Sequence, residues 1–214
     1  MSETPASKRT QGTTAGLDRH RITSAAVELI DRDGLERFGV RRLAKELDVD
    51  PMSIYHHIKG KEALLDAAAA TILAEIATDA AAPDEDWEAL ARRLARAYRD
   101  MAFRHPRVFP LLATRPQNSP SALAVVERLM AAMRAARLPD QVVASAPLTL
   151  FALLNGYLLA ALAEASSPGS APEIDPQAHP TMAALASAGF NWAAEFDRVL
   201  DTAIAGIRER TTDR

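Results

Sequence analysis

The stretch between residues 39 and 61, GVRRLAKELDVDPMSIYHHIKGK, constrains the fold more than any other part of the chain. Apolar residues recur in its first half at positions i, i+3, i+4 and i+7, and they are Val40, Leu43, Ala44 and Leu47. This spacing predicts a short amphipathic helix. In the second half, Asp50 offers an acceptor for free N–H groups and Pro51 fits a first helical position, so a second helix is predicted from about residue 51. Two short helices joined by a tight turn are typical of a helix-turn-helix, which places its second helix in the major groove of DNA.

Helical periodicity continues on both sides of this stretch. Apolar stripes and capping signals predict further helices at about residues 18–33, 61–79, 87–102, 120–138, 140–164 and 190–208. Residues 166–180 are rich in proline and glycine and predict a mobile loop. No strand pattern appears. The predicted fold class is therefore all-α, with an N-terminal three-helix helix-turn-helix domain and a C-terminal helical domain.

The composition excludes several kinds of chemistry. Cysteine is absent, which excludes disulfides, thiolate catalysis and cysteine zinc sites. The sequence has no nucleophile motif, phosphate-binding loop or HExxH pair, so we do not expect an enzyme. The apolar run from Leu148 to Ala163 is only 16 residues long, which predicts a buried helix and no membrane association. Residues 1–16 are polar, lack the apolar region of a signal peptide and are predicted to form a disordered tail.

The net charge of −3 hides a local excess of basic residues. Residues 37–61 contain six basic and three acidic residues. Because local charge governs contact with phosphates, this segment favours DNA binding. Arg92, Arg96 and Arg99 share one side of the helix that begins near Trp87. We expect that side to be solvent-exposed, and a second nucleic-acid surface is the alternative.

Four motifs follow one another between residues 17 and 76. They are Ala-Val-Glu-Leu-Ile followed by Gly-Leu, Arg-Arg-Leu-Ala-Lys-Glu-Leu, Ile-Tyr-His-His, and Lys-Gly-Lys-Glu-Ala-Leu-Leu-Asp. With these motifs the run resembles the DNA-binding domain of the tetracycline-repressor (TetR) family of bacterial transcription factors. One departure is Gly39, where the family usually has a capping Thr or Ser, although glycine is also tolerated at an N-cap.

The second half resembles the branch of this family that has a tetracycline-repressor-type C-terminal domain. The resemblance rests on Trp87, on the triplet Thr114-Arg115-Pro116 and on the apolar helix that ends near Glu164. It implies that the helices at 140–164 and 190–208 pair with their copies in a second subunit, so that the protein is a homodimer. We therefore predict a tail at 1–16, a DNA-binding domain at 17–63, a connecting helix at 64–82, and an effector-binding and dimerisation domain at 83–210.

The resemblance also implies a set of DNA contacts. The positions that match the family's contact residues are Arg41, Pro51, Met52, Ser53, Tyr55, His56 and Lys61. Tyr55 and Lys61 are expected on phosphates, and Arg41 is the best candidate for a bidentate guanine contact. The adjacent pair His56 and His57 could instead indicate a metal, but neighbours on a helix point about 100° apart, whereas helical metal ligands use i, i+4 spacing.

An effector pocket is expected in the second half. Its candidate residues are Tyr98, Met101, Leu111, Thr114, Arg115, Pro116, Met130, Asn155 and Glu164. Core packing is an equal alternative for Met101 and Met130, while Thr114 and Arg115 are the polar groups expected to orient a ligand. The tetracycline repressor has a magnesium-ligating His three residues before the triplet, and Leu111 holds that position here. We therefore expect no metal site and no cofactor, and an apolar or aromatic effector.

These features predict a cytoplasmic, homodimeric regulator that responds to a small molecule. It is expected to be a repressor that an effector releases from a palindromic operator on double-stranded DNA. The alternative is a helical small-molecule-binding or partner-interaction protein that no longer binds DNA. A gel-shift with the DNA that flanks its own coding region separates these two hypotheses.

Overall fold

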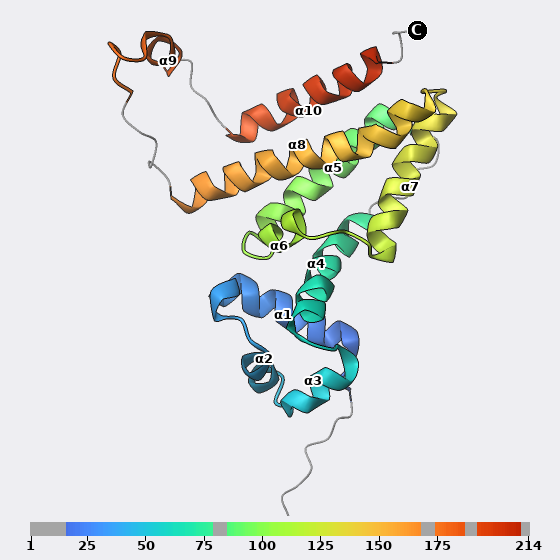
Figure 1. Ribbon diagram of the computed structural model, residues 1–214, viewed down its shortest axis with the longest axis vertical. Coiled ribbons are helices and arrows are strands. Elements are labelled where there is room, and N and C mark those ends of the chain that lie inside the picture. The colour runs from blue at the N-terminus through green and yellow to red at the C-terminus, as the bar shows by residue number, and fades with distance from the viewer. Residues whose placement is uncertain (1–15, 79–84, 168–173, 187–191, 211–214) are drawn as a thin grey trace, which may run out of the picture.

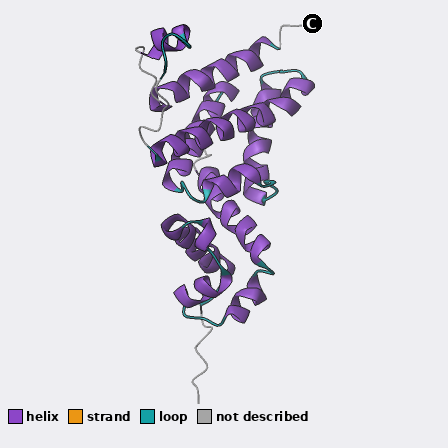
Figure 2. Cartoon of the chain, turned by 60° about the vertical axis from the view of Figure 1, so that its left-hand side comes forward, coloured by secondary structure: helices purple, strands orange, loops and turns teal. Residues whose placement is uncertain are grey.

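The computed structural model describes residues 16–78, 85–167, 174–186 and 192–210. Within these ranges the chain is helical and contains no strand, which confirms the predicted all-α fold (Figures 1 and 2). The elements are α1 (Arg19–Asp33), the 3-10 helix η1 (Leu35–Arg37), α2 (Val40–Glu46), α3 (Pro51–His57), α4 (Lys61–Thr78), α5 (Trp87–Arg104), α6 (Phe109–Thr114), α7 (Pro120–Ala135), α8 (Asp140–Ser166), α9 (Pro180–Ala186) and α10 (Trp192–Glu209).

The small N-terminal domain forms because its helix ends are specified locally. The Asp18 carboxylate accepts the Arg21 N–H at 2.7 Å and begins α1, and Gly34, with a φ of 84°, ends it. Fully buried Ile22, Leu29 and Ile30 form the inner face of α1. This face packs against α4 and α2, so α1 supports the helix pair α2–α3 from behind.

Helix α4 links the two halves of the molecule. It leaves the small domain at Lys61 and continues without interruption to Thr78, inside the larger helical domain (Figure 1). Near its start it packs against α1, and it also contacts α5, α6 and α7. A displacement of α4 in the larger domain is therefore transmitted to the small domain through one rigid element.

The larger domain is built around α8. This helix packs against α5, α6, α7 and α10, and the α10 side chains Phe196, Leu200 and Ile204 are each 1% exposed. Within the described residues, α8 is the one helix long and apolar enough to cross a membrane, but the core helix of a globular protein passes the same test. Only 33% of its most apolar window is buried, so much of an apolar helix remains uncovered in the single chain.

The arginine side of α5 is partly exposed to solvent, and it also contacts α10, which the sequence did not indicate. Arg92 Nε lies 2.9 Å from Asp201 Oδ1, and Arg96 lies 3.0 Å from Asp197 Oδ1. The Arg99 guanidinium lies 4.9 Å from the centre of the Phe196 ring. The partners lie about a hundred residues away on α10, so no local pattern indicated them.

Two further details of the helices differ from the prediction. Helix α8 runs to Ser166, past the predicted end at 164, and α9 was not predicted at all. The tail at 1–15 and residues 168–173 of the predicted mobile loop lie outside the described residues.

Candidate DNA-binding face and effector cavity

The turn between α2 and α3 holds the two helices of the helix-turn-helix together. Asp48 adopts a left-handed conformation with a φ of 53°, which aspartate tolerates better than most residues. The N–H of Val49 donates to the carbonyl of Ala44 at 2.9 Å, and the Asp50 carboxylate accepts the Met52 N–H at 2.7 Å. The predicted cap at Asp50 is therefore present.

The inner edge of α3 fixes which side chains point outward. Ile54 and Ile58 are 1% and 2% exposed and anchor α3 to the core of the small domain. The opposite face lies at the free end of the molecule, away from α5 to α10 (Figure 1). Of the predicted DNA-contact residues, Arg41, Met52, Tyr55, His56 and Lys61 are exposed, and Pro51 and Ser53 are half-buried.

Ion pairs distinguish the arginines around this face. Arg32 makes two hydrogen bonds to the Glu46 carboxylate, at 2.9 and 3.0 Å, and its hydrogen bonds and charge lower the pKa of Glu46. Arg42 lies 2.8 Å from Asp33. Within the described residues, neither Arg41 nor Lys61 has a carboxylate partner. These two cations are therefore available for a phosphate or a base.

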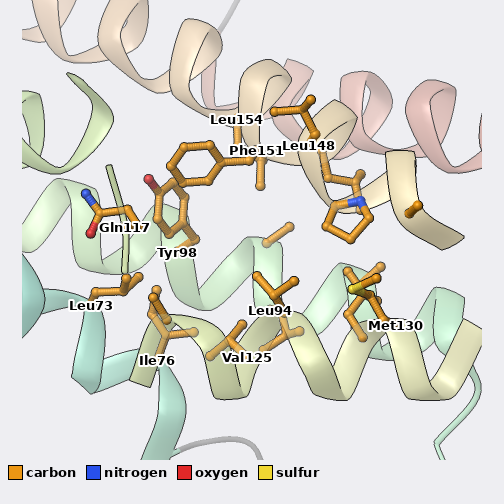
Figure 3. A pocket seen from close by; sticks show the side chains of 18 residues that line it. Leu73, Ile76, Leu94, Tyr98, Gln117, Val125, Met130, Leu148, Phe151 and Leu154 are labelled. Atoms are coloured by element: carbon orange, nitrogen blue, oxygen red, sulfur yellow. The ribbon is translucent and has the colours of Figure 1, made fainter. Parts of the chain in front are cut away.

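A cavity of about 390 Å³ lies between α4, α5, α7 and α8 (Figure 3). Most of its wall is aliphatic or aromatic, and no charged residue lines it among the described residues. The lining residues are Leu73, Ile76, Ala91, Leu94, Ala95, Tyr98, Gln117, Ala122, Val125, Val126, Leu129, Met130, Ala144, Pro147, Leu148, Leu150, Phe151 and Leu154. A site of this size and polarity fits a small apolar molecule.

Among the described lining residues, only Tyr98 and Gln117 have side-chain oxygen or nitrogen atoms, and Figure 3 shows both at one end of the cavity. Tyr98 is 5% exposed, and its hydroxyl donates to Asn155 Oδ1 at 2.7 Å. Burial raises the pKa of Tyr98, so the hydroxyl stays protonated. Phe109 and Phe151 pack against the ring at centroid distances of 5.5 and 6.0 Å and fix its orientation.

The structure brings together only part of the predicted effector set. Tyr98 and Met130 line the cavity, and Asn155 lies behind Tyr98 as its hydrogen-bond partner. Met101 and Leu111 are buried in the core, at 0% and 5% exposure, and do not line it.

The other predicted polar residues lie elsewhere. The Thr114 hydroxyl donates to the carbonyl of Pro110, and Arg115 pairs with Glu62 and Asp66 on α4. Pro116 lines a second hollow, between α1, α4 and residues 116–121. Glu164 is half-buried near the end of α8, outside the lining segment 144–154.

Sequence reasoning missed Gln117 and Phe151. Gln117 directly follows the triplet, and its side-chain nitrogen donates to the carbonyls of Leu112 and Arg115 at 2.9 and 2.8 Å. A polar residue so close to the triplet was the available signal. Phe151 offered none, because an aromatic residue in an apolar helix reads as core.

Polar contacts join the two domains at a second place besides Arg115. His105, at the end of α5, has Nδ1 2.6 Å from Asp31 Oδ2 on α1 and Nε2 3.0 Å from Glu75 Oε1 on α4. Arg107 also donates to the carbonyl of Arg32 at 2.8 Å. The turn between α5 and α6 is thereby held against the end of α1.

Comparison with known families identifies the chain. The family described as bacterial regulatory proteins, tetR family, matches residues 22–68. The domain described as tetracyclin repressor-like, C-terminal domain, matches residues 80–211, which is more than half of the chain. The chain belongs to the TetR family. The regulators of this family are transcription factors rather than enzymes.

Individual TetR-family relatives agree with this assignment. The HTH-type transcriptional repressor DrrR1 of Streptomyces coeruleorubidus is 31% identical over 145 residues, which cover 68% of this chain and 52% of the relative. The chain thus spans about half the length of the curated relatives it matches. A possible TetR-family regulator from Streptomyces coelicolor A3(2) is 27% identical, with a TM-score of 0.79 and coverage of 90% and 99%.

A further solved structure shows the same fold. ActR of Streptomyces coelicolor, in complex with (S)-DNPA, has a TM-score of 0.78 at 24% identity and covers 90% of this chain and 98% of its own. At that identity the likeness extends to the fold alone. Within the described part of this TetR-family chain, no group of three or more His, Asp or Glu residues is arranged to hold a metal ion.

Proposed function

We propose that this chain is a homodimeric transcriptional repressor that a small apolar effector releases from a palindromic operator. The observation that carries the proposal has two parts. Arg41 and Lys61 are exposed cations without a carboxylate partner among the described residues, and helix α4 connects their domain to the apolar cavity. The name of the relative DrrR1, a transcriptional repressor, supports the sign of the regulation. We take the protein to act in the cytoplasm, where its DNA is, and to have no enzymatic role.

For DNA binding we propose a division of labour on the exposed face. Arg41 donates to a guanine edge, and Tyr55 and Lys61 bind phosphates. Met52 is 61% exposed and has no side-chain donor, so with Pro51 it reads thymine methyl groups by apolar contact. The neighbouring candidates Ser53 and His56 complete the contact set.

For assembly we propose a dimer through α8 and α10. On α8 a stripe of small residues is exposed or half-exposed among the described residues: Ser145, Thr149, Ala152, Gly156, Ala160 and Ala163. A second such stripe on α10 includes Thr202, Ala205 and Gly206. Small side chains allow helices to approach closely, so two copies can bury both stripes in a four-helix bundle. The two α3 helices would then enter successive major grooves about 34–36 Å apart.

For regulation we propose that the effector binds without a metal or another cofactor. Leu111 and Leu112, at and next to the position of the metal-binding His in the tetracycline repressor, are buried and carry no ligand atom. Leu73 and Ile76 of α4 line the cavity, so a ligand there contacts the helix that carries the small domain. A ligand that prefers one position of α4 therefore shifts the dimer toward the state with the wrong spacing of the two α3 helices.

We also propose that the chain divides functionally near the predicted boundaries. Residues 17–63 would bind DNA, residues 64–82 would connect, and residues 83–210 would bind the effector and the second subunit. The connecting helix α4 begins at Lys61, so its first turn belongs to the DNA-binding domain.

The test is DNA binding by the full-length protein, measured by fluorescence anisotropy with duplexes that flank its own coding region. We expect salt-dependent binding to one palindromic duplex that is at least about a thousandfold tighter than to random duplex. Equal affinity for all duplexes would favour the alternative of a helical small-molecule-binding or partner-interaction protein. Adding tetracycline with and without magnesium to the protein–DNA complex tests the effector class. Magnesium-dependent release at micromolar drug would overturn the proposal of a metal-independent apolar effector.

A further inference from the structure

In both polar side chains that line the described cavity, the hydrogen-bond donors are already used, so that only acceptors remain for a ligand. Tyr98 has one hydroxyl proton, and it donates that proton to Asn155 Oδ1 at 2.7 Å. The oxygen of Tyr98 therefore has only lone pairs left for a ligand. Because burial raises the pKa of this hydroxyl, deprotonation does not change that role near neutral pH.

Gln117 is committed in the same way. Its amide nitrogen carries two protons, and the carbonyls of Leu112 and Arg115 accept from that nitrogen at 2.9 and 2.8 Å. The remaining polar atom of this side chain is Oε1, which only accepts. Figure 3 shows Gln117 next to Tyr98, so the two polar side chains share one end of the cavity.

Pro147 of α8 also lines the cavity and has no N–H, so it offers a ligand no donor. The other described lining side chains are carbon, apart from the sulfur of Met130.

We infer that the cavity selects an uncharged apolar molecule that carries a hydroxyl or N–H donor at one end, and that this donor binds Tyr98 Oη and Gln117 Oε1. The inference rests on the proposed effector role of the cavity and names the ligand class. A ligand with only acceptors, such as an ether or ketone, would face lone pairs and leave its polar atom unsatisfied. A carboxylate would lose its hydration without meeting a positive charge.

This ligand class differs from the expectation based on sequence. There the polar end of the ligand was expected to meet Arg115 or Thr114, of which Arg115 would favour an acceptor or an anion. In the structure both residues are engaged outside the cavity. The polar end of the site is instead built from Tyr98 and Gln117. These side chains accept hydrogen bonds from a ligand, whereas Arg115 would have donated them.

A series of biphenyl probes of similar shape tests the inference on the full-length protein. The probes are 4-phenylphenol as the donor, 4-methoxybiphenyl as the acceptor, biphenyl as the apolar parent and biphenyl-4-carboxylate as the anion. By equilibrium dialysis we expect 4-phenylphenol to bind about tenfold more tightly than 4-methoxybiphenyl. The carboxylate should bind most weakly of the four.

Variants locate the preference. Gln117→Met and Tyr98→Phe keep the volume and remove one acceptor each, so each should reduce severalfold the ratio of the affinity for 4-phenylphenol to the affinity for biphenyl. Gln141→Met, an exposed change on α8 outside the cavity, should alter neither. If Tyr98→Phe unfolds because Asn155 loses its donor, Gln117→Met and the wild-type series still decide.

The outcomes separate the inference from the proposed function. Equal or tighter binding of the ether or the carboxylate would overturn the ligand class and leave the cavity as an effector site. Binding of none of the four probes would overturn both the ligand class and the cavity assignment. A donor preference without any operator binding would support the ligand class and contradict the repressor function.

Discussion

At the scale of single residues, partners decide which charges can act outward. Arg41 and Arg42 are adjacent and both exposed, yet Arg42 lies 2.8 Å from Asp33 while Arg41 has no carboxylate partner among the described residues. A helix places neighbours about 100° apart, so only one of the two can face the acidic end of α1. Sequence alone names Arg41 through the family resemblance, whereas the ion pairs give a physical reason to prefer it.

Arg41 is predicted to give sequence specificity through a base contact, and Lys61 is predicted to position the protein on DNA through a phosphate contact. Arg41→Ala is expected to cost about 1–3 kcal/mol of binding free energy at one base pair of the operator, and to relax specificity there. Lys61→Ala should weaken operator and random duplex alike and reduce the salt slope by about one. Anisotropy titrations over a range of salt concentrations measure both, with Arg42→Ala as the control. An equal loss on operator and random duplex for Arg41→Ala would show that Arg41 does not read a base.

The backbone at Arg137 adopts a conformation that is unfavourable for arginine and that glycine adopts freely. It follows the end of α7 with a φ of 62°, a left-handed conformation that glycine adopts freely. Arg137→Gly should therefore raise the free energy of unfolding by about 0.5–1 kcal/mol. The matched control, Arg134→Gly in the last turn of the same helix, should lower it by about 1 kcal/mol. Urea unfolding measures both, and a destabilised Arg137→Gly would contradict the conformational argument.

At the scale of elements, what could be predicted is what is encoded locally. The starts of α1, α3 and α5 follow from Asp18, Asp50 and Asp86, whose carboxylates each accept a backbone N–H in the next turn. The cavity could not be predicted in this way, because its wall comes from four helices that are distant in sequence. A stripe of apolar residues looks the same whether it meets a neighbour or a void, which is why Met130 and Met101 could not be told apart.

Arg115 is predicted to couple the effector cavity to the DNA-binding domain through helix α4. Arg115 pairs with Glu62 and Asp66 in the first turns of α4, beside Lys61. Gln117, in the cavity wall, holds the carbonyl of Arg115. Arg115→Gln should thus lower by about 0.5–2 kcal/mol the coupling free energy by which 4-phenylphenol weakens operator binding.

The matched control for this coupling is Arg134→Gln, which changes an exposed arginine on α7 away from α4. Affinity for 4-phenylphenol without DNA should stay the same in both variants, since neither residue lines the cavity. Operator affinity is measured with and without saturating 4-phenylphenol. An unchanged ratio of the two affinities in Arg115→Gln would exclude this route of coupling.

At the scale of the whole molecule, the single chain leaves apolar surface that a second copy can cover. Leu148 is 71% exposed although it also lines the cavity, and Met182 and Leu185 of α9 are 57% and 65% exposed. Exposed apolar surface is typical of protein interfaces. The mouth of the cavity beside Leu148 lies close to this surface, so assembly and effector binding are expected to influence each other.

A charge on the exposed stripe of α8 should abolish the dimer without harming the fold of the chain. In the part of the chain that the structure describes, no atom lies within 4 Å of a Cβ added to Gly156, and Ala160, one turn further, is exposed. Ala160→Glu would therefore stay hydrated in a monomer but would bury an unpaired carboxylate in a dimer, which costs several kcal/mol. Light scattering at micromolar concentration should give the mass of two chains for the wild type and of one chain for the variant. Ala131→Glu, on the exposed side of α7, should remain dimeric.

Because operator binding needs two α3 helices at a fixed spacing, the monomeric variant should lose the preference for a palindrome while its helical circular dichroism is kept. A dimeric Ala160→Glu would place the interface elsewhere, and a palindrome-specific monomer would refute the two-fold arrangement of the reading heads.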